Sequence, residues 1–138
     1  MAIDVVMTIT SDGDTAQAIQ ESPAHIGIES SHEWPFDSRP HFLDYPFTNE
    51  STTFEDHLAA AERHKPHITT APDVEKGRKL TDVVSMGDKL LDYSDNVIIV
   101  PKTCHPTDIP DRFRVGLTVG NFGSMAPWGL YEYASVDS

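Results

Sequence analysis

The segment from Pro66 to His105 constrains the fold of this chain more than any other part of the sequence. It contains two short runs of β-branched and aliphatic residues, Ile68–Thr70 and Val97–Val100, and a proline and a charged residue follow each run. Between them, apolar residues recur at helical spacing over residues 75–95. This order predicts a right-handed strand-helix-strand unit with parallel strands. The uninterrupted apolar run at Val97–Val100 is typical of a strand that is buried on both faces.

Strand and helix patterns alternate on both sides of this unit. The expected strands are residues 3–10, 25–30, 41–47 and 113–119, the expected helices are residues 15–21 and 51–64, and a turn or single helical turn is expected at 107–112. Such alternation predicts an α/β fold with a parallel sheet. A closed eight-stranded barrel needs about 200 residues or more. The 138 residues therefore predict a single domain, 1–138, with a partial TIM-barrel-like sheet of about six strands that does not close.

The helix expected at residues 51–64 carries a start signal and an apolar face. Thr52 and Glu55 have the spacing of a capping box. The apolar residues that share one face at helical spacing are Phe54, Leu58 and Ala61. We therefore expect both histidines of this helix, His57 and His64, at the surface.

The chain is strongly acidic, with a formal net charge of -12 from 22 acidic and 10 basic residues. The acidic residues are spread along the sequence, which indicates an acidic surface and not an acidic tail. Such a surface is typical of adaptation to high salt, where screening removes the repulsion between like charges. The same charge disfavours non-specific nucleic-acid binding, which depends on clusters of Lys and Arg.

The single cysteine, Cys104, excludes an internal disulfide and a multi-cysteine zinc site. The histidines show no spacing that would support a metal site with it, so we expect no metal and no cofactor. The first ten residues lack a basic region and a long apolar run, so they predict neither a signal peptide nor a membrane span. We expect a cytoplasmic protein, or one in the host cytoplasm if it is viral, without a membrane partner.

Polar residues follow several of the expected strands: Asp44, Asp73, Lys102 and the pair Gly120-Asn121. The carboxyl ends of parallel strands meet at one edge of a sheet, so these residues are expected to converge there. Lys102 should pair with one carboxylate and lower its pKa, while burial raises the pKa of the other, as in an acid/base site. The alternative is that Asp73 caps a helix starting near Glu75 and that Lys102 is solvated.

Six segments of the chain resemble an uncharacterised family of archaea, bacteria and their tailed viruses, which itself looks like a distant branch of the tRNA-guanine transglycosylase superfamily. The segments are HFLDYPF (41–47), FEDHLAAAERHKP (54–66), APDVEKG (71–77), NVIIVPK (96–102), IPDRFRVG (109–116) and the glycine loop Gly120–Gly123. The resemblance extends over roughly residues 3–133. Viral members of that superfamily exchange guanine in DNA for a 7-deazaguanine.

The resemblance implies roles for individual residues. Asp44 matches the acid/base aspartate of the superfamily, and Asp73 matches the aspartate that holds the guanine edge. The loop at Gly120 and Asn121 matches the backbone that binds the base carbonyl. Lys102 stands where the superfamily has a glutamine. The superfamily's covalent aspartate and its zinc site come after the seventh and eighth strands and have no match in this sequence, so base exchange by the chain alone is not expected.

The sequence leaves three functions open. The first is a transglycosylase-like half-barrel for guanine or 7-deazaguanine modification of nucleic acid, with a second barrel half or another copy of the chain as partner and a purine-like base as ligand. The second is a non-catalytic binding or assembly module; the resemblance to a family with viral members leaves a viral origin open. The third is a small-molecule lyase or isomerase that uses Asp44, Asp73 and Lys102.

Overall fold

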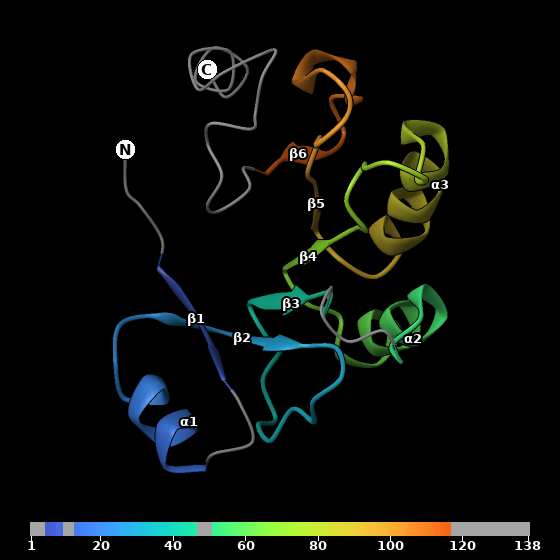
Figure 1. Ribbon diagram of the computed structural model, residues 1–138. Helices are drawn as coiled ribbons and strands as arrows, with labels where there is room; N and C mark the ends of the chain where they lie inside the picture. Colours follow the sequence, from blue (N-terminus) through green and yellow to red (C-terminus); the bar gives the residue numbers. More distant parts are fainter. Residues whose placement is uncertain (1–4, 10–12, 47–50, 117–138) are drawn as a thin grey trace.

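The computed structural model describes residues 5–9, 13–46 and 51–116 of the chain. Within these residues the protein is an α/β structure with one open sheet of six parallel strands (Figure 1). The strands are β1 (Val6–Ile9), β2 (His25–Glu29), β3 (Phe42–Asp44), β4 (Ile68–Thr70), β5 (Asn96–Ile99) and β6 (Arg114–Val115). Each strand pairs with the next one along the chain. This is the strand order of a TIM barrel, so the expected partial-barrel sheet is confirmed.

The described helices are α1 (Gly13–Gln20), α2 (Phe54–His64), α3 (Leu80–Leu91) and the short 3-10 helix η1 (Pro106–Asp108). Helices α2 and α3 contact each other and lie on the same side of the sheet in Figure 1. The connection between β2 and β3 contains no helix, and a loop of residues 30–41 takes its place. Within the described residues, no helix has the length and apolarity that a membrane crossing requires.

A row of buried side chains runs across the sheet and forms the centre of the core. Its members pair strand to strand and are each at most 2% exposed: Ile9, Ile28, Leu43, Thr69 and Val97. Paired residues of adjacent strands point to the same face. Because Thr69 contacts His57 of α2, this face is the one that the helices cover. The burial of apolar surface in this row of side chains stabilises the sheet.

Strand β5 is fully buried on one face only. Val97 and Ile99 are 0% exposed, whereas Ile98 between them is partly exposed. The prediction of a strand buried on both faces is therefore wrong for the second face. The strand pairs on both edges, but among the described elements the helices cover only the side to which Val97 and Ile99 point.

Two helices begin later than the sequence patterns predicted. The capping box of α2 is formed by Thr53 and Asp56, one residue after the predicted pair Thr52 and Glu55. Helix α3 begins at Leu80 and not near residue 75, because residues 75–78 form a turn in which Gly77 has a positive φ of 89°. A left-handed residue cannot continue a helix, so the turn delays the start of α3.

Part of the expected site lies outside the described residues. This applies to Gly120, Asn121 and residues 117–119 of the last expected strand. It also applies to residues 127–133; the sequence predicts that this segment, or a second subunit, covers the open edge of the last expected strand.

Candidate functional site

The backbones after β4 and β5 stay together beyond the ends of the strands, which brings Asp73 next to Lys102. Ala71 N–H donates to the Ile98 carbonyl at 2.9 Å. Farther along, Lys102 N–H donates to the Val74 carbonyl at 2.9 Å, and Val74 forms a parallel bridge with Pro101. The prediction that both residues lie side by side at the carboxyl edge is confirmed.

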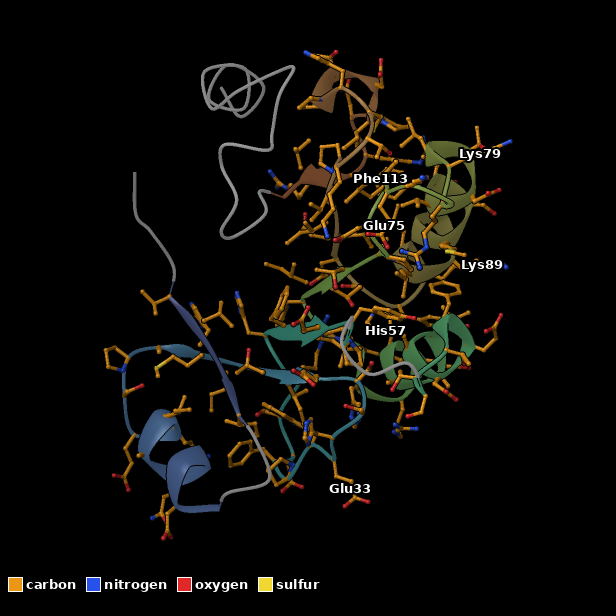
Figure 2. The ribbon with its side chains drawn as sticks, in the orientation of Figure 1. Glu33, His57, Glu75, Lys79, Lys89 and Phe113 are labelled. Carbon is orange, nitrogen blue, oxygen red and sulfur yellow. The ribbon has the colours of Figure 1, made fainter. Side chains whose placement is uncertain are left out.

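The side chains of these two residues form an ion pair. Lys102 Nζ lies 2.6 Å from Asp73 Oδ2 and 3.8 Å from Glu75 Oε2. The Asp73 side chain is only 6% exposed, whereas that of Lys102 is 41% exposed. Figure 2 labels Glu75 in the segment that leads from this pair to α3. The ammonium group therefore shields a buried carboxylate from the solvent side.

The second oxygen of Asp73 has no hydrogen-bond partner. Oδ1 is buried, and no donor among the described residues reaches it. A buried carboxylate oxygen without a donor is unfavourable, because the protein does not replace the hydrogen bonds that water would give. An atom in this state at the carboxyl edge of a parallel sheet is a candidate for contact with a ligand that donates an N–H or O–H.

The pKa of Asp73 is raised above its ordinary value. Burial is the largest cause, and it outweighs the hydrogen bond and the charge of Lys102, both of which lower the pKa. We predicted that the carboxylate paired with Lys102 would have a lowered pKa, and this direction is wrong. The ammonium group is half in solvent, so it compensates only part of the desolvation of the carboxylate.

Asp44 lies at the same edge, at the end of β3. Burial raises its pKa most, the charge of Glu29 adds to this, and the charge of Asp73 also contributes. The Thr70 hydroxyl lies 3.5 Å from Asp44 Oδ1, which lowers the pKa in part. Asp44 ends β3 and Asp73 follows β4, the neighbouring strand, so both residues lie toward the carboxyl edge. Both favour the protonated form more than a solvated aspartate does.

His57 of α2 contacts the end of β4 next to this site. Its Nε2 lies 2.8 Å from the Thr70 carbonyl and 3.1 Å from the Thr69 hydroxyl, and its ring packs edge-on against Tyr45. Figure 2 labels His57 where α2 faces the sheet. The residue is 0% exposed, so the prediction of a surface histidine is wrong. Burial lowers its pKa to about 4, and the ring is neutral at pH 7. His57 lies three residues after Phe54 and four before Ala61, so helical spacing was the signal that could have found it.

The turn before α3 places a second cation near Asp73. Arg78 Nη1 donates to the Asp73 carbonyl and to Glu75 Oε1, each at 3.2 Å. A cavity of about 400 Å³ opens beside this turn, with Glu75, Arg78 and Cys104 in its lining. Burial raises the pKa of the Cys104 thiol, which disfavours the thiolate that a nucleophile or metal ligand requires.

Asp73 does not cap α3, so the alternative interpretation of this residue is wrong. The N-cap position is Lys79, and no side chain donates or accepts a capping hydrogen bond there. Within the described ranges, His, Cys, Asp and Glu side chains form no group of three or more that could hold a metal ion. We call Asp44, Asp73 and Lys102 the carboxyl-edge site. Lys102 contacts Asp73 directly, and Asp44 ends the strand next to β4.

Comparison with known proteins gives one result. No solved structure and no curated protein matches the chain. A family model matches residues 24–137, which covers β2 to β6 and the whole carboxyl-edge site. The chain belongs to this family, which is described as a family of unknown function (DUF6610).

Proposed function

We propose that the carboxyl-edge site binds the hydrogen-bonding edge of guanine or a 7-deazaguanine, as part of nucleic-acid base modification. One observation carries this proposal. Asp73 is a buried carboxylate with one oxygen fixed by Lys102 and the other without a donor among the described residues. The guanine edge presents adjacent N–H donors, and a carboxylate accepts such donors well.

The ion pair gives this carboxylate a fixed orientation. Lys102 holds Oδ2 at 2.6 Å, so Oδ1 is the oxygen that remains for a ligand. A base that donates to Oδ1 would replace the hydrogen bond that burial removed. A site of this kind discriminates strongly, because an analogue without the donor leaves the carboxylate unsatisfied.

Asp44 is the proton-handling group in this proposal. Its pKa is raised by burial and by the charges of Glu29 and Asp73, which makes it a better proton donor near neutral pH than a solvated aspartate. The resemblance to the transglycosylase superfamily supports the same two roles for Asp44 and Asp73. It also implies that base exchange involves a second barrel half or a second copy of the chain, in the cytoplasm of the cell or of a host.

A second candidate is proton-transfer chemistry on a small molecule, as in a lyase or isomerase. Two carboxyl groups with raised pKa values beside a lysine favour it. Acid/base enzymes use such pairs. A lyase or isomerase of this kind should bind guanine-like bases and adenine equally. The binding experiment below therefore separates this candidate from the base-binding function.

The test is isothermal titration calorimetry of the full chain in high salt with 7-deazaguanine, hypoxanthine and adenine. We expect 7-deazaguanine to bind about 10-fold or more tightly than hypoxanthine, which lacks the amino donor, and adenine to bind least. Asp73→Asn should remove this preference, since the amide offers one acceptor oxygen and no charge.

Asp88→Asn is the matched control. Asp88 is also an aspartate paired with a cation, Arg112, but it is exposed on α3 and outside the site. The control should bind 7-deazaguanine as the wild type does. Equal affinity for all three bases, or a preference that survives in Asp73→Asn, would exclude the proposed function.

A further inference from the structure

A second cavity lies at the opposite edge of the sheet, where the parallel strands begin. His25 is the first residue of β2, His41 directly precedes β3, and His67 directly precedes β4. All three imidazoles line a cavity of about 260 Å³. The rings of His25 and His41 are stacked with centroids 4.0 Å apart, and those of His41 and His67 are 5.8 Å apart. We call this the amino-edge cavity.

The absence of a helix between β2 and β3 explains why a cavity exists here. The loop of residues 30–41 covers this part of the sheet, with Trp34 and Phe36 packed against the core. Their rings meet edge to face, with centroids 5.0 Å apart, and the Trp34 indole N–H donates to the Ser38 carbonyl. The loop thus adds two aromatic rings to the cavity lining.

The chemistry of the lining differs from that of the rest of the chain. The chain carries 22 acidic residues and seven histidines. None of the described residues that line the cavity is acidic, whereas three of them are histidines and one is Arg39. The carboxylate of Asp95 lies outside the lining and pairs with Arg39 at 3.3 Å and with His67 at 3.0 Å.

Arg39 has donors that its contacts in the protein do not use. Its Nε donates to the Lys65 carbonyl at 2.6 Å, and its Nη2 contacts Asp95 at 3.3 Å and the Pro66 carbonyl at 3.5 Å. Among the described residues, Nη1 has no acceptor in these contacts. These three contacts hold the guanidinium plane in place, and Arg39 lines the cavity.

We propose that the amino-edge cavity is a binding site for a small planar aromatic anion, such as an aromatic carboxylate. The ring packs against the imidazoles and the rings of Trp34 and Phe36, and the anionic group accepts from Arg39. Flat walls of aromatic rings favour a planar ligand. The Arg39 guanidinium is paired with Asp95 through Nη2 only, so its other terminal nitrogen can donate to an anion. The inference does not rest on the proposed function, because the two sites occupy opposite edges of the sheet.

The test is NMR of the full chain at pH 7.5 with benzoate and its neutral analogue benzamide as probes. The observed signal is the indole N–H of Trp34. We expect benzoate to shift this signal with a dissociation constant of about 1 mM, which is reasonable for so small a ligand. Benzamide should bind about 10-fold more weakly, because it loses the charge-assisted hydrogen bond.

Arg39→Gln should bring the two affinities to within about 2-fold of each other. Arg63→Gln is the matched control, since Arg63 is an exposed arginine of α2 outside the cavity lining; it should keep the preference for benzoate. If Arg39→Gln does not fold by thermal melting, Phe36→Leu tests the ring wall while keeping the Trp34 signal, and it should weaken both probes alike. No shift at Trp34 with either probe, or equal affinity for both in the wild type, would overturn the proposal.

Discussion

Lys102 holds only one of the two oxygens of Asp73. Its Nζ lies 2.6 Å from Oδ2, while Oδ1 is buried and without a partner among the described residues. The net result is a carboxyl group whose pKa is raised although it has a cation beside it. The buried carboxylate and its ion pair are the basis of the first prediction.

Lys102→Met should destabilise the protein at pH 7 by about 1–2 kcal/mol, because Asp73 then carries a buried charge without a counterion. The loss is smaller than for a fully buried pair, since Lys102 is 41% exposed. The loss should shrink on acidification, because a protonated Asp73 needs no cation. Urea unfolding of the wild type and of Lys102→Met at pH 7 and pH 4 measures the loss of stability and its decrease on acidification. Lys76→Met, an exposed lysine in the following turn, is the control and should change stability by less than about 0.5 kcal/mol.

His57 should make the protein less stable as the pH falls from about 6.5 to about 4. Its pKa is about 4 in the folded protein and 6.5 when unperturbed, so the unfolded state binds the proton first in this window. The difference corresponds to at most about 3 kcal/mol. His57→Gln keeps an N–H donor for Thr70 but does not titrate, so it should lose less stability over this range in urea unfolding.

The comparison of His57→Gln with the wild type separates the pH dependence of stability that comes from His57 from the part that comes from the carboxyl groups. Asp44 and Asp73 have raised pKa values, so the folded state binds their protons first and acid stabilises it, which is the opposite sign. His64→Gln on the same helix is the comparison. Burial lowers the pKa of His64 as well, but this ring is only partly buried, so its replacement should change the pH slope less. The same pH slope in the wild type and in His57→Gln would contradict the buried position of this ring.

Gly87→Ala should destabilise the protein although alanine favours helices. A Cβ at Gly87 would lie 2.6 Å from Cε1 of Phe113. The Phe113 ring is buried, and the residue directly precedes β6. The clash should outweigh the gain in helix propensity, which is about 1 kcal/mol, and leave a net loss of about 1–2 kcal/mol. Ser85→Ala, at an exposed position of α3, is the control and should be neutral or stabilising in chemical denaturation.

Salt should stabilise the fold. The net charge of -12 creates repulsion that screening reduces, and the Debye length falls from about 10 Å at 0.1 M salt to about 3 Å at 1 M. We expect the melting temperature to rise over this range in NaCl and KCl alike. An unchanged melting temperature would contradict the proposal that the acidic surface is an adaptation to high salt.

The parallel sheet could be predicted because each strand and each helix has its own pattern within a short, continuous segment of the sequence. Ile68–Thr70 and Val97–Val100 each end at a proline, which located the ends of β4 and β5 within one or two residues. The positions of Asp73 and Lys102 followed from parallel topology alone. The start of α3 was missed because the apolar spacing gave no sign of the turn at Gly77.

The electrostatics of the site could not be predicted in the same way. The depth at which Asp73 is buried does not follow from its position in the sequence, and this burial decides the direction of its pKa shift. The burial of His57 was accessible from its helical position, but its polarity favoured the wrong interpretation. The capping pair was displaced by one residue because Thr52-Glu55 and Thr53-Asp56 have the same spacing.

Titration of the aspartate side-chain carboxyl carbons by ¹³C NMR, with and without 7-deazaguanine, tests the carboxyl-edge site most directly. We predict that Asp44 and Asp73 titrate above the ordinary aspartate value and that Asp88 titrates below it. Adding the base should shift the Asp73 signal and lower its pKa, because N–H donors favour the charged form, and should leave Asp88 unchanged. An Asp73 signal that titrates at the ordinary value and does not respond to the base would contradict the account.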